Sequence, residues 1–142
     1  MPTANAEQIS IDASPETVWQ VITDFQSFPE WNPMTPSMRG ELSQGAKLKG
    51  MLGLGPLKVP FFPKLLTVEP TAELRWKGGV PGAFVADHRF IVEPGPGGGS
   101  ILRHHEEFAG LFAVKGPTVK TANRVHAEFN RACKRRAEES ST

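Results

Sequence analysis

The spacing of apolar and polar positions predicts one long helix near the end of the chain. Residues 116–140 form the only long segment without Gly or Pro in its interior, and Gly116 with Pro117 fits a helix start. Six residues recur at steps of three or four and so share one face of a helix. They are Val119, Ala122, His126, Phe129, Cys133 and Arg136. We therefore predict a helix of about six turns. It needs a partner surface, because isolated helices are only marginally stable in water.

Polar residues occupy an unusual share of the inner face of this predicted helix. Asn123, His126, Asn130 and Cys133 lie on or beside that face, where a helix packed against a dry core would carry Leu and Ile. Two interpretations remain open. The helix either covers a small core with a few hydrogen-bonded polar groups, or its inner face borders a cavity.

Short segments of alternating apolar and polar residues predict an antiparallel sheet before this helix. Strands are predicted over residues 8–12, 34–41, 46–52, 58–69, 72–77, 84–93 and 101–108. Pro60 and Pro63 place the first half of the fourth segment at a sheet edge or bulge. Residues 94–99 are rich in Gly and Pro and should form a hairpin loop between the last two strands.

Two short helices are predicted between the first and second strands. Ser14 can cap the first helix, Pro15 suits its first position, and apolar residues up to Phe25 follow at helical spacing. A second turn of helix over residues 28–33 should end at Pro33. This order of elements predicts an α+β fold in which a meander sheet wraps on the terminal helix.

Length and composition restrict the class of protein. A chain of 142 residues fits one domain, which we expect to span residues 1–142. The net charge of +1 gives no general attraction to nucleic acid or membranes, and no apolar run is long enough for a transmembrane helix. The single cysteine and the lack of a signal-peptide pattern predict a cytoplasmic protein. A basic cluster is interpreted as a solvated helix face: Arg131, Lys134, Arg135 and Arg136.

Several short motifs occur in an order that resembles one protein superfamily. They are Ile11-x-Ala13-x-Pro15-x-x-Val18-Trp19, Asp24-Phe25, Pro29-x-Trp31-Asn32-Pro33, Gly45 with Leu48, Val68-Glu69-Pro70, Glu73-Leu74-Arg75-Trp76, His88-Arg89-Phe90, Glu106-x-Phe108-x-Gly110 and the region of Asn130. This series resembles the START-like, polyketide cyclase/dehydrase and Bet v 1-like (SRPBCC) superfamily and covers most of the chain.

The resemblance implies a fold and a class of ligand. The fold is the helix-grip, in which a curved seven-stranded antiparallel β-sheet wraps on a long C-terminal α-helix around a deep apolar cavity. The implied ligand is a hydrophobic small molecule. No single reaction is implied, because the superfamily includes carriers, receptors and enzymes, so function has to be argued from the site.

Strand alternation predicts which side chains face that cavity. Because side chains alternate between the two faces of a strand, the more apolar set of each strand should point toward the helix. The inward sets are Phe84, Ala86, His88, Phe90 and Val92; Leu102, His104, Glu106 and Phe108; and Leu74 with Trp76. A hairpin centred on residues 97–98 would place His88 near Glu106, and Phe90 near His104. The Gly-rich loop fixes this register poorly, so the inward sets are predicted from strand alternation and the pairing stays open.

The predicted ligand-binding residues combine these sets with the terminal helix and the second short helix. They are Trp31, Asn32, Trp76, Phe84, His88, Phe90, Leu102, His104, Glu106, Phe108, Ala122, His126 and Phe129. We expect a mainly apolar cavity on the order of 300–1,000 Å³, with its mouth near Trp31, Asn32 and residues 51–57. That apolar, glycine-containing segment is either a lid over the mouth or a plain connection between strands.

His88, His104, Glu106 and His126 allow three interpretations. They could form a zinc site, an acid/base pair acting on a bound ketone or ester, or a buried hydrogen-bonded pair that anchors the polar end of a ligand. A metal is not predicted, because the chain lacks compact ligand spacing such as H-E-x-x-H. No cofactor is predicted either.

Three functions are compatible with this sequence. The leading prediction is binding or transport of a hydrophobic small molecule, lipid-like or aromatic, by a monomer or weak dimer without stable membrane insertion or nucleic-acid binding. The second is a cyclase/dehydrase-type enzyme with His88, His104 and Glu106 as acid and base groups. The third is a protein-interaction module with a vestigial cavity.

Overall fold

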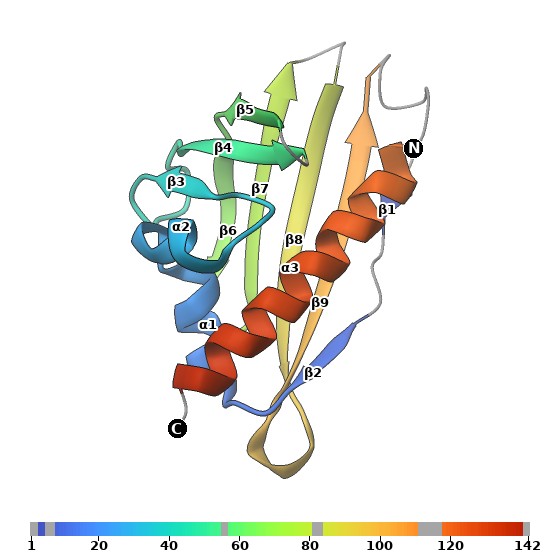
Figure 1. The fold of residues 1–142 in the computed structure, drawn as a ribbon. Coiled ribbons are helices and arrows are strands. Elements are labelled where there is room, and N and C mark those ends of the chain that lie inside the picture. The colour runs from blue at the N-terminus through green and yellow to red at the C-terminus, as the bar shows by residue number, and fades with distance from the viewer. Residues whose placement is uncertain (1–2, 5–7, 55–56, 81–83, 111–117, 141–142) are drawn as a thin grey trace.

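Helices and strands follow one another in the predicted order, from short strands and two short helices to a meander and a long helix (Figure 1). The computed structural model describes residues 3–4, 8–54, 57–80, 84–110 and 118–140. Its elements are β1 (Thr3–Ala4), β2 (Ile9–Ile11), α1 (Pro15–Thr23), the 3₁₀ turn η1 (Phe25–Ser27), α2 (Phe28–Trp31), β3 (Ser37–Arg39), β4 (Lys49–Leu54), β5 (Leu57–Phe61), β6 (Lys64–Glu69), β7 (Glu73–Val80), β8 (Phe84–Pro94), the 3₁₀ turn η2 (Pro96–Gly98), β9 (Ser100–Ala109) and α3 (Thr118–Ser140). The α+β prediction is confirmed.

The described strands form two antiparallel sheets. One has the order β1-β9-β8-β7-β6, with β2 also paired to β9, and the other has the order β3-β4-β5. A bridge between Lys47 and Lys64 links them. The segment predicted as one strand over residues 58–69 is split into β5 and β6, because Pro63 has no N–H with which to continue a ladder. The helix-grip architecture is thus confirmed, with its strands divided between two sheets instead of one sheet of seven.

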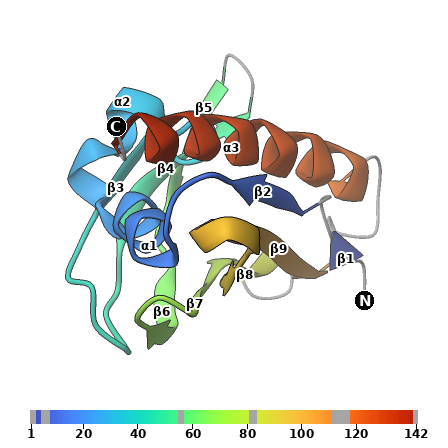
Figure 2. The ribbon, with the colours of Figure 1, turned by 90° about the horizontal axis from the view of Figure 1, so that it is seen from below.

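The long helix α3 lies diagonally across one face of the six-stranded sheet (Figures 1 and 2). Its buried residues are His126, Phe129, Asn130, Ala132, Cys133 and Ala137. Arg136, predicted on this inner face, is instead partly exposed and bonds to Glu30 at 2.9 Å. The inner face continues from Cys133 to Ala137, four residues on, and not to Arg136, three residues on. A helix of 3.6 residues per turn needs steps of four more often than steps of three. None of the helices in the described ranges is long and apolar enough to cross a bilayer.

The first helix begins where the sequence predicts. The Ser14 side chain accepts a hydrogen bond from the Thr17 backbone N–H at 3.2 Å, and Pro15 takes the first helical position. Trp19 is 8 % exposed, in agreement with an amphipathic helix. After α2, the side-chain oxygen of Asn32 accepts hydrogen bonds from two backbone N–H groups of the following turn, at 3.0 and 2.9 Å, and so fixes the path toward β3.

The β8–β9 hairpin has the predicted register. His88 lies opposite Glu106, and Phe90 lies opposite His104. The Gly97 and Gly98 backbones adopt φ angles of 67° and 81°, a region that favours glycine, and so allow the tight connection. Buried and less buried residues alternate along β8, so the predicted inward set does face α3.

Two clusters of apolar residues lie between α3 and the sheets. The larger contains α1, α2 and one half of α3, where Phe129 packs against Trp31 and Phe90 at ring-centroid distances of 5.2 and 5.5 Å. The smaller, centred on Ala86 and Phe108, lies toward β1. The candidate site lies between them.

Candidate functional site

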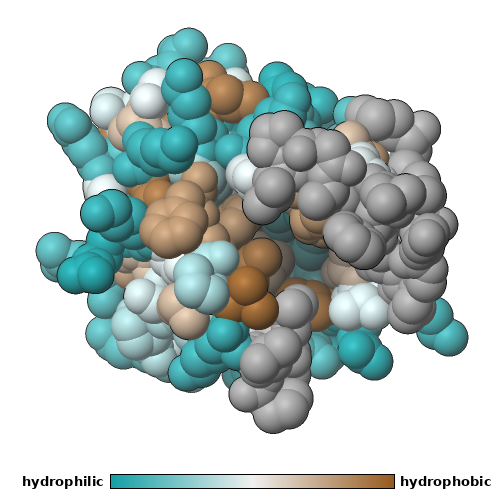
Figure 3. Space-filling view, turned by 90° about the horizontal axis from the view of Figure 1, so that it is seen from above, coloured by the Kyte–Doolittle hydropathy of each residue, from teal (hydrophilic) through white to brown (hydrophobic). Residues whose placement is uncertain are grey.

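An apolar cavity of about 510 Å³ lies between α3, β7–β9 and the small sheet. Members of both apolar clusters contribute to its wall. Its volume is within the range expected from the sequence and typical of small-ligand sites. Figure 3 views the molecule from above and shows a hollow in this face with hydrophobic residues at its edge.

The predicted binding residues separate into two groups in the structure. Those that line the cavity are Trp76, Phe84, His88, Glu106, Phe108, Ala122 and His126. Those that pack away from it are Trp31, Asn32, Phe90, Leu102, His104 and Phe129. Strand alternation places Phe90, Leu102 and His104 on the correct face of the sheet. At these positions, however, side chains of the helix pack against the sheet and fill the space. Contact of the first group with a ligand remains a prediction.

Sequence reasoning missed much of the cavity wall. The additional lining residues are Met34, Thr35, Val59, Pro60, Phe61, Gly78, Gly79, Thr121 and Val125. The two glycines were the available signal, because Gly inside a strand marks a close approach. A Cβ at Gly78 would lie 2.9 Å from the ring of Phe61. At Gly79 the φ angle is 134°, and a Cβ would collide with the carbonyl oxygen of Phe84.

The segment predicted to be a lid or a plain connection belongs mainly to a hairpin. Residues 51–54 lie in β4, residue 57 begins β5, and the two strands are paired. Leu52 and Gly53 line the cavity, together with Met34 and Thr35 in place of the expected Trp31 and Asn32. Residues 55 and 56 lie outside the described ranges, and a lid role remains a prediction.

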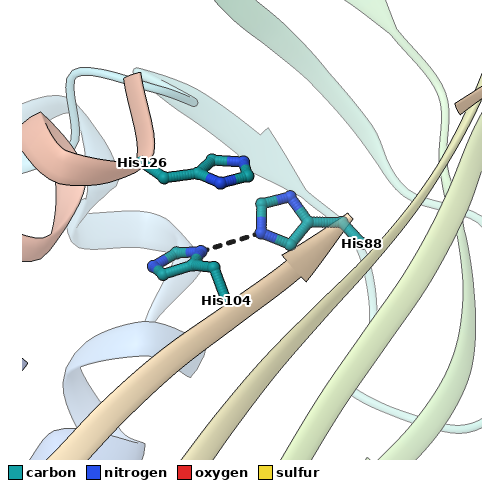
Figure 4. A group of neighbouring side chains, drawn as sticks. All are labelled: His88, His104 and His126. Carbon is teal, nitrogen blue, oxygen red and sulfur yellow. Dashed lines mark hydrogen bonds between the residues drawn. The ribbon is translucent and has the colours of Figure 1, made fainter. Parts of the chain in front are cut away.

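Three histidines and one glutamate form a connected polar cluster at the cavity wall (Figure 4 shows the histidines). His126 Nε2 lies 2.9 Å from Glu106 Oε1, and His88 Nδ1 lies 3.6 Å from Glu106 Oε2. His88 Nε2 lies 2.9 Å from His104 Nδ1. The cluster thus connects β8, β9 and α3 through one carboxylate.

Burial controls the charge state of this cluster. It lowers the pKa of His88, against the opposing effect of Glu106, and lowers the pKa of His104 well below its usual value. Burial alone would raise the pKa of Glu106, but charge interactions and hydrogen bonds with His88 and His126 outweigh it and lower this pKa to about 2. At neutral pH we therefore expect an ionised Glu106 and a neutral His104.

The hydrogen bonds fix the tautomer of His126. An ionised carboxylate only accepts hydrogen bonds, so His126 Nε2 must donate its N–H to Glu106. In the neutral ring, Nδ1 then carries a lone pair. This nitrogen is buried and has no hydrogen-bond partner among the described residues. Such an arrangement can donate a lone pair to a ligand, or take part in acid/base chemistry with Glu106.

Comparisons with known proteins give the family from a family model and the fold from solved structures. The family model described as polyketide cyclase/dehydrase and lipid transport matches residues 3–138. A START superfamily protein from Mycobacterium smegmatis is 18 % identical, with a TM-score of 0.81 over 97 % of this chain and 98 % of that one. A protein from Mesorhizobium loti is 16 % identical, with a TM-score of 0.79 over 99 % of this chain and 100 % of that one.

A third solved structure, from Thermus thermophilus, is 13 % identical, with a TM-score of 0.78 over 99 % of this chain and 100 % of that one. No curated protein sequence matches the chain. Because the family model spans nearly the whole sequence, the family is shown, while the solved structures support the fold. The chain belongs to the polyketide cyclase/dehydrase and lipid transport family.

Proposed function

We propose that this protein binds or transports a hydrophobic small molecule, lipid-like or aromatic, inside the cavity. The observation that carries the proposal is the apolar cavity of about 510 Å³ with its polar groups gathered mainly at one wall. Transfer of apolar surface from water into such a space contributes roughly 25 cal/mol per Å². The polar groups cannot supply most of the affinity, but they can orient the ligand.

The chemistry of the polar wall restricts the ligand further. The Glu106 carboxylate would repel a carboxylate or phosphate on the ligand, because the interaction of like charges is strong in a site of low polarity. A neutral hydroxyl group could instead donate a hydrogen bond to Glu106, and Thr35 and Thr121 also border the space. The proposed ligand is therefore mainly apolar, with a neutral polar group at one end.

A neutral fluorescent dye such as Nile red tests this proposal. The wild-type protein should bind about one dye molecule per chain, with increased fluorescence. Ala122→Trp should abolish binding, because Ala122 lines the cavity and the larger side chain would fill it. Arg124→Trp adds the same side chain to an exposed position of the same helix and should leave binding unchanged.

The result can contradict the proposal in two ways. Wild-type protein that binds no dye, and carries no small molecule in native mass spectrometry, would remove the small-molecule function. Equal loss of dye binding in both tryptophan variants would show that the dye does not bind in the cavity. Circular dichroism of each variant checks that the fold is retained.

An enzyme with acid/base chemistry is the second candidate. Glu106 lies between His88 and His126, and all three border the cavity, so a proton could be exchanged with a bound substrate. Glu106→Gln should then lower kcat by about 10²–10⁴, while the outward-facing Glu107→Gln should not. If ligands that co-purify bind but undergo no reaction, the protein is a carrier.

We also place the protein in the cytoplasm. Its single cysteine, Cys133, is free and buried, as is usual in a reducing compartment. Fractionation of cells that express the tagged full chain tests this placement, and recovery in a membrane or secreted fraction would contradict it.

A further inference from the structure

Three buried imidazoles lie beside one another, although they come from three different elements. His88 belongs to β8, His104 to β9 and His126 to α3. Their ring centroids form a near-equilateral triangle with sides of 5.1, 4.7 and 4.9 Å. In Figure 4 the three rings lie close together, with His88 and His126 directed toward one another and His104 beside them; the rings of His104 and His126 are stacked.

The ring nitrogens could form a metal site after a small inward shift. One ring nitrogen from each histidine lies within 4.8 Å of the other two. Zinc–nitrogen bonds of about 2.0–2.1 Å in a tetrahedral site place ligand nitrogens about 3.3 Å apart. The pair His88 Nε2 and His104 Nδ1, at 2.9 Å, would separate slightly, and the third imidazole would move inward.

The glutamate supplies the outer support that metal-bound imidazoles usually have. Histidine ligands typically donate their second ring N–H to a carboxylate or carbonyl, which fixes the tautomer and the ring orientation. Here Glu106 accepts a hydrogen bond from His126 Nε2 at 2.9 Å. Its second carboxylate oxygen lies 3.6 Å from His88 Nδ1. The opposite nitrogens, His126 Nδ1 and His88 Nε2, are thereby left with lone pairs.

An unpartnered buried nitrogen points to a missing ligand. His126 Nδ1 has no hydrogen-bond partner in the described part of the chain, and the His126 side chain is only 1 % exposed. A buried acceptor without a partner is unfavourable. A metal ion would satisfy this lone pair. His88 Nε2 and His104 Nδ1 already form a hydrogen bond with one another, while His104 Nε2 is also buried without a hydrogen-bond partner among the described residues.

We propose that His88, His104 and His126 bind one divalent transition-metal ion, with Zn²⁺ as the ion whose ligand preference fits best. Imidazole nitrogen suits Zn²⁺ and related transition metals, while Mg²⁺ and Ca²⁺ prefer oxygen ligands. The ionised Glu106 partly compensates the charge of the cation. His88 and His126 line the cavity, so the ion can enter from it.

Starting from three neutral imidazoles, binding requires one tautomer change and no net loss of a proton. His88 Nε2 and His104 Nδ1 share one hydrogen, which His104 carries when the His88 proton is on Nδ1, facing Glu106 at 3.6 Å. When the ion replaces this hydrogen bond, the His104 proton moves from Nδ1 to Nε2. The Asn130 side chain opposes the lowering of the His104 pKa and so favours a proton on this ring.

Titration of chelator-treated protein with Zn²⁺ tests the proposal. Isothermal titration calorimetry should give one Zn²⁺ per chain, the melting temperature should rise, and Co²⁺ should give the visible absorption of a four- or five-coordinate site. His126→Gln should weaken Zn²⁺ binding by at least about 100-fold, and Glu106→Gln by about 10–100-fold, as outer-shell substitutions usually do. His105→Gln, on the outer face of the same strand as His104, should leave the affinity unchanged.

Each outcome decides the question. Failure of the wild-type protein to bind Zn²⁺ or Co²⁺ at micromolar concentration would overturn the proposal. So would equal losses in His105→Gln and His126→Gln, because the ion would then bind at the surface. If a histidine variant does not fold, two other measurements replace it. These are the Zn²⁺ affinity of Glu106→Gln and the histidine ¹⁵N chemical shifts of the wild-type protein, which should change when Zn²⁺ is added. The proposal does not depend on the apolar ligand, whose dye assay has a separate readout.

Discussion

Glu106 joins the sheet to the terminal helix through a hydrogen bond of 2.9 Å from His126 Nε2 to its Oε1 atom. The two side chains are 13 % and 1 % exposed, so the contact is largely shielded from bulk water and borders only the cavity. The second carboxylate oxygen faces His88 at 3.6 Å. One side chain therefore influences the stability of the helix-grip, the polarity of the cavity and the orientation of two imidazoles.

Removal of the Glu106 charge should destabilise the fold. Glu106→Gln keeps the shape of the side chain but replaces a charge-assisted hydrogen bond with a neutral one, and we expect a loss of about 1–3 kcal/mol. Urea unfolding followed by circular dichroism measures this loss. Glu107→Gln, on the outer face of β9, should change stability by less than about 0.5 kcal/mol. Equal effects of the two substitutions would contradict a structural role for the buried carboxylate.

Stability of the metal-free protein should fall as the pH decreases below about 6.5. Burial lowers the pKa of His88 and His104, so in this range the unfolded chain binds protons that the folded protein does not. The free energy of unfolding therefore decreases with decreasing pH. Glu106 also contributes to this loss of stability. Because its pKa is about 2 in the folded protein and ordinarily 4.5, its contribution is lost as the pH falls from 4.5 to about 2.

Urea unfolding of chelator-treated protein at pH values from about 7.5 to 4 measures this dependence. His104→Gln should reduce the slope near pH 6, because it removes one buried group that the unfolded state protonates. A free energy of unfolding that increases on acidification over this range would show that the histidines are charged in the folded protein.

Strand parity explains why much of the cluster could be predicted from the sequence. The period of two along β8 and β9 places His88, His104 and Glu106 on the face toward α3 without any knowledge of tertiary structure. This alternation is a local property of the backbone, and the structure confirms it. The register between the strands could not be predicted with the same certainty, because a Gly-rich loop allows several pairings, and the structure supplies it.

The boundary of the cavity could not be predicted in the same way. Phe90 and Phe108 are both inward residues, yet only Phe108 lines the cavity, because the Phe129 ring of α3 packs against Phe90 at a centroid distance of 5.5 Å. Met34 lines it because the small sheet is positioned beside it. Such distances depend on the packing of whole elements, which no local pattern encodes. The close triangle of the three imidazoles has the same origin, since its members come from three elements rather than one compact motif.

Substitution of Phe129 by a charged residue should prevent folding. Phe129 is 1 % exposed and contacts the rings of Trp31, Phe90 and His104. Phe129→Asp would bury a carboxylate without a partner, at a cost of several kcal/mol, roughly. We expect no cooperative melting transition by calorimetry. Arg131→Asp, at an exposed position of the same helix, should still unfold cooperatively, and a normal transition for Phe129→Asp would contradict the position of α3.

Cys133 should resist alkylation until the protein unfolds. Its side chain is fully buried in α3, and burial raises the pKa of the thiol to about 12, so only about one molecule in 10⁴ carries the reactive thiolate at pH 8. Mass spectrometry after treatment with iodoacetamide should show slow labelling of the native chain and rapid labelling in urea. Because labelling then requires separation of α3 from the sheet, Glu106→Gln should accelerate it and Glu107→Gln should not. Rapid labelling of the native wild-type protein would mean that the thiol is accessible, and would contradict the packing of the terminal helix against the sheet.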